Sequence, residues 1–247
     1  MSRNGVRTRG RPASLGAIVL AGAVCAMIAG CAPGTPNSAT EPPGAASGTP
    51  DPRASASASS RPTPGDPPAA GPTFAVVGDS ISHADSADFA AGDIDPASWV
   101  TYVRDAGFTF AGGWAEWGAT TALMADSVAP VDAETLVVLA GTNDFALGVP
   151  FAETSANLDR IVETVGIDEV VVASVPPMAA FPEGATELNQ RLQDLAGTRG
   201  WRFVDASAGL RDGDGRYVEE MTSDGIHPSE EGAQVLGEAI AGALRGG

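Results

Sequence analysis

The chain has 247 residues, and its 31 acidic side chains outnumber its 14 basic ones, all of which are arginine. Without lysine there is no Schiff-base or P-loop lysine, and two cysteines are too few for a disulfide scaffold or a thiolate zinc site. The scarcity of clustered cations argues against a nucleic-acid partner and against a folded domain that docks on an anionic membrane surface.

The first thirty residues are predicted to be a secretory signal. Four arginines within the first eleven residues precede an apolar run over residues 15–29, which is the order of a signal peptide. The run ends in Ile-Ala-Gly-Cys at Cys31 and resembles the cleavage signal of bacterial lipoproteins. This resemblance implies that Cys31 becomes the lipidated first residue, anchored to the outer face of the membrane. An uncleaved membrane anchor is the alternative. Both interpretations place the rest of the chain outside the cell membrane.

Residues 31–72 are expected to be a disordered tether behind this anchor. Residues 32–72 contain 11 of the 19 prolines and no Val, Ile, Leu, Met or aromatic residue. Such a segment buries no apolar area that would offset the entropy of ordering. We therefore expect a partly stiff linker with a polyproline II bias.

Residues 73–247 have the size of one domain, in which 28 acidic residues stand against 8 arginines. Five apolar runs predict strands at 74–77, 108–110, 136–140, 170–173 and 203–204. The third and fourth runs are continuously apolar, which is typical of strands buried on both faces of a parallel sheet.

Helical patterns lie between and after these strands. Apolar residues at i, i+3, i+4 and i+7 predict a helix over residues 158–165, and leucines predict another over 188–195. Ser229 is the candidate N-cap of a last helix over 230–240. Alternating strands and helices predict a three-layer α/β/α sandwich around a parallel sheet of about five strands. Reactive groups are then expected at the carboxyl ends of the strands.

Four short motifs stand at such places. The first strand ends in Gly78-Asp79-Ser80, and a glycine- and tryptophan-rich segment over 112–121 follows the second. The third strand ends in Gly-Thr-Asn-Asp at 141–144, and Asp-Gly-Ile-His-Pro occupies 224–228. Each motif alone is typical of an ordinary turn, but their order and positions together are specific.

The combination resembles the SGNH branch of the GDSL hydrolases over nearly all of residues 73–247, with a flavodoxin-like fold. In that family a serine, a glycine, an asparagine and a histidine follow one another in the chain. The matching residues here are Ser80, Gly118, Asn143 and His227. Gly112 and Gly113 are alternatives to Gly118. The spacing to the predicted helix start at 120–121 favours Gly118.

The chemistry of acyl transfer explains these residue types. A serine hydroxyl is a poor nucleophile until a base takes its proton, and His227 is the candidate base for Ser80. Asp224, three residues earlier, is the candidate that orients the imidazole. The resemblance also implies an oxyanion hole made by the backbone N–H groups of Ser80 and Gly118 and the side-chain amide of Asn143.

The sequence leaves several alternatives open. His83 is the only other histidine and a second candidate base. Asp79 is expected to be a buried structural residue rather than a second catalytic carboxylate. The second glycine of the Gly-x-Ser-x-Gly elbow is absent after Ser80, which disfavours the ordinary α/β-hydrolase fold. Aromatic and apolar residues predicted in loops after strands suggest a partly apolar acyl site: Trp114, Trp117, Phe145, Met178 and Phe181.

The function that the resemblance implies is an exported serine esterase, acting on an acyl lipid or an O-acylated carbohydrate. An acyltransferase with the same site and a non-catalytic binding lipoprotein are the alternatives. No metal or organic cofactor is implied. We expect a monomer whose membrane contact is limited to the N-terminal lipid anchor.

Overall fold

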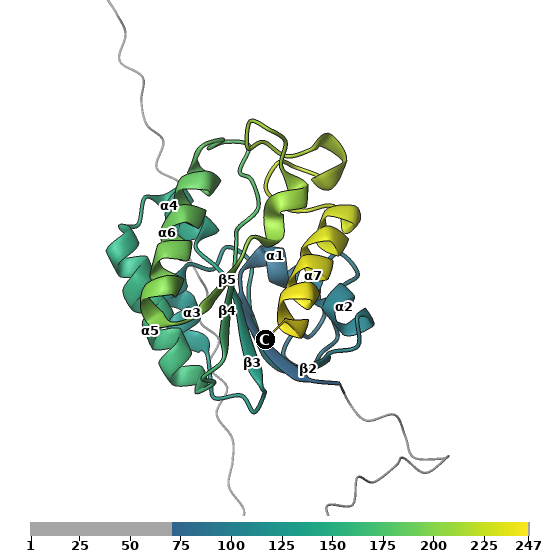
Figure 1. Cartoon of the computed structure of the whole chain (residues 1–247), viewed down its shortest axis with the longest axis vertical. Coiled ribbons are helices and arrows are strands. Elements are labelled where there is room, and N and C mark those ends of the chain that lie inside the picture. Colours follow the sequence, from purple (N-terminus) through teal and green to yellow (C-terminus); the bar gives the residue numbers. More distant parts are fainter. Residues whose placement is uncertain (1–70, 247) are drawn as a thin grey trace, which may run out of the picture. The chain divides into compact units, whose positions relative to one another are not determined.

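The computed structural model describes residues 71–246, which belong to one compact unit (Figure 1). The predicted signal segment, Cys31 and the tether up to residue 70 lie outside the described residues. Within residues 71–246, no helix is both long and apolar enough to cross a membrane.

A sheet of five parallel strands forms the centre of the domain, in the order β2-β1-β3-β4-β5. The strands are β1 (Thr73–Gly78), β2 (Thr109–Ala115), β3 (Thr135–Leu139), β4 (Val170–Ala173) and β5 (Arg202–Val204). Beyond their first residues, β1 and β3 are buried throughout, as is all of β4. This double-sided burial explains their continuously apolar sequences, and the predicted α/β fold is confirmed.

Helices cover both faces of the sheet (Figure 1). On one face lie α3 (Thr121–Ser127), α4 (Thr142–Leu147), α5 (Phe151–Val165) and α6 (Gly184–Arg199). On the other lie α1 (Ser80–His83), α2 (Trp99–Asp105) and α7 (Glu230–Arg245), with two 3-10 turns, η1 (Ala206–Leu210) and η2 (Glu219–Met221), in the preceding segment. The three helices predicted from apolar periodicity are α5, α6 and α7, and Ser229 caps α7 by accepting the N–H of Gly232 at 3.2 Å.

The prediction that the second strand ends at residue 110 is wrong, because β2 continues to Ala115. The register shifts between Phe74 and Ala75 of β1, which leaves one extra β2 residue as a bulge. Gly113 then packs against β1 so closely that a Cβ atom would lie 2.0 Å from the carbonyl oxygen of Val76. The glycines that suggest a turn in the sequence therefore serve strand pairing.

Candidate active site

Ser80 is held at the carboxyl end of β1, which lies between β2 and β3. The chain passes from Gly78 through Asp79 into α1, whose first residue is Ser80. Asp79 caps this helix, since its Oδ1 atom accepts the N–H of Ile81 at 3.0 Å. The serine side chain is therefore fixed by a strand end and a capped helical turn, at the edge of the sheet where ligands bind in such folds.

The loop over residues 222–228 presents His227 to this edge. The backbone N–H groups of Ile226 and His227 both donate to the Oδ1 atom of Asp224, at 2.9 and 2.8 Å. The Thr222 hydroxyl donates to the His227 carbonyl at 2.7 Å and accepts the N–H of Gly225 at 2.9 Å. These bonds close the loop on itself and fix the position of the imidazole.

Tyr217 holds the same loop from outside. Its hydroxyl donates to the carbonyl of Ile226 at 2.9 Å. Burial raises the pKa of Tyr217, and the carboxylates of Asp224 and Asp79 raise it further, so the hydroxyl remains a donor. Neither Tyr217 nor Thr222 belongs to a motif that the sequence singles out, because both act only through backbone groups of the folded loop.

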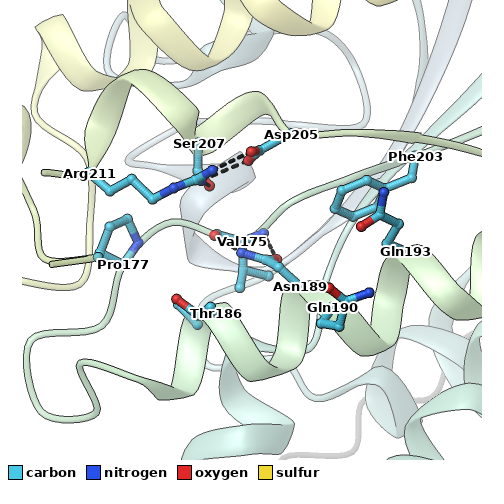
Figure 2. A pocket seen from close by; sticks show the side chains of 12 residues that line it. Val175, Pro177, Thr186, Asn189, Gln190, Gln193, Phe203, Asp205, Ser207 and Arg211 are labelled. Carbon is cyan, nitrogen blue, oxygen red and sulfur yellow. Dashed lines mark hydrogen bonds and ion pairs between the residues drawn. The ribbon is translucent and has the colours of Figure 1, made fainter. Parts of the chain in front are cut away.

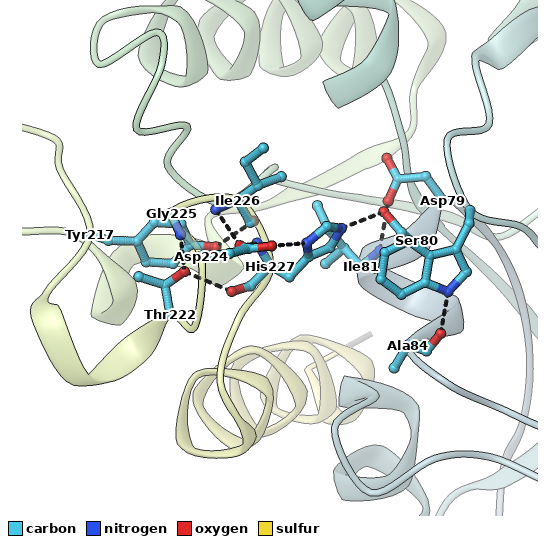
Figure 3. A network of polar contacts seen from close by, with 11 residues as sticks. Asp79, Ser80, Ile81, Ala84, Tyr217, Thr222, Asp224, Gly225, Ile226 and His227 are labelled. Carbon is cyan, nitrogen blue, oxygen red and sulfur yellow. Dashed lines mark hydrogen bonds and ion pairs between the residues drawn. The ribbon is translucent and has the colours of Figure 1, made fainter.

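Ser80, His227 and Asp224 form one row of hydrogen bonds (Figure 3). The Nε2 atom of His227 lies 2.9 Å from the Ser80 hydroxyl oxygen, and its Nδ1 atom lies 2.7 Å from Oδ2 of Asp224. A carboxylate at Nδ1 favours the tautomer that is protonated there, which leaves Nε2 free to accept the serine proton. The structure thus brings together the three residues predicted for the triad.

The Asp224 carboxyl is adapted to stay ionised beside the imidazole. Partial burial raises its pKa, but the hydrogen bonds from the His227 ring and from the backbone N–H groups of His227 and Ile226 outweigh that effect. The net pKa of Asp224 is therefore below its ordinary value. Near neutral pH the carboxylate is available to orient the imidazole.

Gly118 and Asn143 follow β2 and β3, the two neighbours of β1 in the sheet. Gly118 has a φ of +69° and open space where a side chain would be. The Asn143 side-chain amide donates to the carbonyl of Ala119 at 2.9 Å, so it lies against the backbone next to Gly118. The Asn143 amide thus lies against the loop that carries Gly118.

Asp144 connects the helix that carries Asn143 to the helix that follows Gly118. Its buried carboxylate accepts the N–H of Thr121 at 2.8 Å and also the Thr121 hydroxyl, which ties the start of α3 to α4. It also accepts the Thr154 hydroxyl of α5 at 3.2 Å. Asp144 is therefore a structural acceptor that keeps Asn143 and Gly118 in register.

His83 contacts only neighbouring residues and is not part of the hydrogen-bonded row of Ser80, His227 and Asp224. Its Nδ1 atom lies 2.8 Å from the carbonyl oxygen of Ala84, and its ring stacks on Phe89 with centroids 6.1 Å apart. The neighbouring Ala84 has a φ of +48°, a strained value for a residue other than glycine. His83 therefore stabilises the tight end of α1.

Trp117 covers the imidazole from the side of the β2–α3 loop. Its indole N–H donates to the Ala84 carbonyl at 2.5 Å, and its ring lies 4.8 Å from that of His227, centroid to centroid. Together with Ser80, Trp117 lines a cavity of about 160 Å³ beside the triad. Of the residues predicted for an acyl site, this is the one that lines the cavity.

The other predicted acyl-site residues lie elsewhere. Trp114 belongs to β2 rather than to a loop, and it lines a separate cavity with apolar residues of β1. Phe145 packs edge-on against Phe181 at 5.8 Å and lines a third cavity beside α5 and α6. Met178 is buried in the core. The structure therefore does not bring this group together as one pocket.

Asp79 is fully buried, and its second carboxylate oxygen has no hydrogen-bond partner among the described residues. Burial raises the pKa of Asp79 from 3.8 to about 7, although the N–H of Ile81 and the charge of His227 lower it in part. The carboxyl is thus poised to change its charge close to the triad, which the sequence motif alone does not indicate.

Replacing Asp79 by asparagine should change how stability depends on pH. Between the unfolded pKa of about 4 and the folded pKa of about 7, the native carboxyl holds a proton that the unfolded chain has lost. The wild type should therefore lose stability relative to Asp79→Asn as pH rises through this window. Urea unfolding of both proteins at several pH values measures the difference, and a constant difference would contradict the pKa shift.

Fold and site together define a hydrolase built on a three-layer α/β/α sandwich. The chain belongs to the GDSL-like lipase/acylhydrolase family, whose model matches residues 76–235. It is thus an ester-hydrolysing enzyme, and the resemblance found in the four sequence motifs is confirmed. No curated protein matches the chain in sequence.

Solved structures share this fold. A protein from Streptococcus pneumoniae is 23% identical, with a TM-score of 0.57, over 72% of this chain and 86% of that one. A lipase/acylhydrolase from Enterococcus faecalis is 19% identical, with a TM-score of 0.52, over 71% and 96%. A mutant of an acetyl-xylooligosaccharide esterase from Geobacillus is 16% identical, with a TM-score of 0.53, over 69% and 94%. At these identities the likeness supports the fold alone.

Proposed function

We propose that the chain is an extracytoplasmic serine esterase that works through an acyl-enzyme on Ser80. The observation that carries the proposal is the continuous row of hydrogen bonds from the Ser80 hydroxyl through His227 to Asp224. His227 takes the serine proton while the oxygen attacks the ester carbonyl, and then gives the proton to the leaving alcohol. Asp224 keeps the imidazole in the required tautomer throughout.

The oxyanion that forms during attack needs donors at fixed positions. Ser80 begins α1, and the first N–H groups of a helix have no partner within the helix. Gly118 and Asn143 follow β2 and β3, the two strands on either side of β1. The Asn143 amide has a second N–H besides the one that bonds Ala119. These three groups are the proposed oxyanion hole.

The acyl-enzyme is completed when a second nucleophile attacks it. Water gives hydrolysis, the activity of this family, and His227 is positioned to deprotonate it. A sugar hydroxyl in its place would give acyl transfer. The related structures include both a lipase/acylhydrolase and an acetyl-xylooligosaccharide esterase, so lipid and carbohydrate esters are the two substrate classes to compare. Product analysis with and without a sugar acceptor separates hydrolysis from transfer.

Fluorophosphonate labelling tests the nucleophile. The probe should label the wild type, and Ser80→Ala should remove the label because the attacking oxygen is lost. Ser223→Ala is the matched control, since Ser223 lines the same cavity but lies outside the hydrogen-bonded row. Labelling that survives in Ser80→Ala would overturn the acyl-enzyme proposal.

Asn143→Ala tests the oxyanion hole. Removal of one such donor typically costs about 10²–10³ in kcat, and we expect that loss with p-nitrophenyl acetate. Asn157→Ala is a suitable control, because Asn157 donates to the Thr121 hydroxyl at 3.2 Å and touches the supporting network instead. Equal activities of Asn143→Ala and wild type would remove Asn143 from the mechanism.

The proposed location depends on Cys31. If the chain is a lipoprotein, metabolic labelling with palmitate should mark the wild type and not Cys31→Ala, because only the cysteine accepts the lipid. Absence of palmitate from the wild type would instead favour the uncleaved anchor.

A further inference from the structure

A second cavity opens at the carboxyl edge of the sheet, between α6 and the loop after β5 (Figure 2). Its volume is about 170 Å³, and it shares none of its lining residues with the cavity beside Ser80. An apolar cavity of about 150 Å³ is known to hold benzene. The second cavity therefore has room for one six-membered ring.

One wall of this cavity is a polar stripe on α6. Its side chains follow the i, i+3, i+4, i+7 spacing of a single helix face: Thr186, Asn189, Gln190 and Gln193. Asn189 is fixed, because its side chain accepts the N–H of Val175 at 2.8 Å and donates to the Val175 carbonyl at 2.9 Å. The Thr186 and Gln193 side chains are exposed to solvent.

The opposite wall is a fixed ion pair. The Arg211 guanidinium donates to both oxygens of the Asp205 carboxylate and, at 3.1 Å, to the Ser207 hydroxyl. The Ser174 hydroxyl also donates to Asp205 at 3.2 Å. The paired charges cancel, so this wall offers planar donors and acceptors without a net charge.

Phe203 adds an apolar surface between the two walls, next to Gln193 (Figure 2). The cavity thus combines one aromatic ring with several planar polar groups. Most polar groups in it are already fixed by contacts within the protein, so little order is lost when a ligand binds.

We infer that this cavity binds one ring of a neutral carbohydrate. A sugar ring presents neighbouring hydroxyls, each a donor and an acceptor, to amide, carboxylate and guanidinium groups. Its C–H face packs on an aromatic ring such as Phe203. An anion is disfavoured because Asp205 already neutralises Arg211 and the domain as a whole is strongly acidic.

A peptide fits the cavity less well. Extended peptides commonly bind by adding a strand to an exposed sheet edge, and the edge strand β5 comprises only three residues. The volume of a cavity alone does not determine which ligand it binds. The cavity lined by Trp114 has the same volume of about 170 Å³, but apolar residues of β1 and of the segment after α3 dominate its lining.

The position of the cavity relates it to Ser80. The strands run in the order β1-β3-β4-β5, and neighbouring strands lie about 4.8 Å apart. The residues after β4 and β5 are therefore roughly 10–15 Å along the same edge from Ser80. The next step rests on the proposed esterase function. If that function holds, the bound ring belongs to the same glycan as the ester.

Calorimetric titration of the full-length chain with cellotetraose, xylotetraose and chitotetraose tests the site. At least one of these unesterified sugars should bind, and the double variant Thr186→Val, Gln193→Leu should weaken binding about tenfold or more. A tenfold loss corresponds to about 1.4 kcal/mol. Gln234→Leu, an exposed position on α7, is the control and should bind as the wild type does.

The inference is overturned if none of the three sugars binds, if the double variant binds as tightly as the wild type, or if tetra-alanine binds as tightly as the sugars. Hydrolysis of p-nitrophenyl acetate should be unchanged in the double variant, which shows that it is folded. Sugar binding without any esterase activity in the wild type would remove the proposed function but leave this site in place.

Discussion

Replacing His227 by alanine should lower kcat for p-nitrophenyl acetate by about 10⁴-fold or more, as expected when the general base of a triad is removed. His227 is the histidine whose Nε2 atom lies within hydrogen-bond distance of the Ser80 oxygen, at 2.9 Å. Without it nothing in the described residues is placed to take the serine proton. KM should change far less than kcat, because the imidazole acts mainly in the transition state.

His83→Ala is the matched control for this experiment. His83 lies three residues after Ser80 in the sequence, but its Nδ1 atom is bound to the Ala84 carbonyl and its ring stacks on Phe89. Its removal should leave most of kcat and cost some stability, since it supports the strained turn at Ala84. A larger loss of activity from His83→Ala than from His227→Ala would reverse the assignment of the base.

The sheet could be predicted from the sequence because its central strands are buried on both faces and are therefore continuously apolar. The helices α5, α6 and α7 showed apolar stripes because each buries one face against the core. The helices α1 and α4 did not, since four and six residues are too few to reveal a helical period. The length of β2 depended on a bulge and on the close approach of Gly113 to β1, and neither is visible without the partner strand.

The residues of the site were predictable for a different reason. The resemblance to the GDSL hydrolases singled out Ser80, Asn143 and His227. Their motifs stand at strand ends and in one late loop, and topology brings such places to one edge of the sheet. The lining of the cavities was not predictable, because it depends on which way each side chain points. Gln193 and its neighbours on α6 have the sequence of an ordinary solvent-exposed helix face, and only the loop after β5 makes that face a cavity wall.

The charges around the two cavities favour the same kind of substrate. The predicted domain has 28 acidic residues and 8 arginines, so it repels anionic substrates as a whole. The cavity at Ser80 contains Asp85 and Asp224, whereas the second cavity is neutral through its Asp205–Arg211 pair. Both features favour an uncharged ester over a phosphorylated or otherwise anionic one.

Replacing Asp224 by asparagine should lower kcat by about 10⁴-fold although the loop stays folded. The asparagine oxygen can still accept the backbone N–H groups of Ile226 and His227, which the Oδ1 atom accepts at 2.9 and 2.8 Å. Its side-chain amide, however, would donate to Nδ1 of His227 and favour the tautomer protonated at Nε2. That imidazole cannot accept the proton of Ser80, so the nucleophile stays inactive.

Fluorophosphonate labelling of Asp224→Asn should slow in parallel with kcat, because both reactions need the same activated serine. Asp85→Asn is the matched control: it removes the same charge from the same cavity, but Asp85 is not hydrogen-bonded to the His227 ring. If both variants lose activity equally, the carboxylate acts through its charge alone. If Asp224→Asn alone loses it, while its thermal unfolding midpoint stays near that of the wild type, the carboxylate acts by fixing the tautomer.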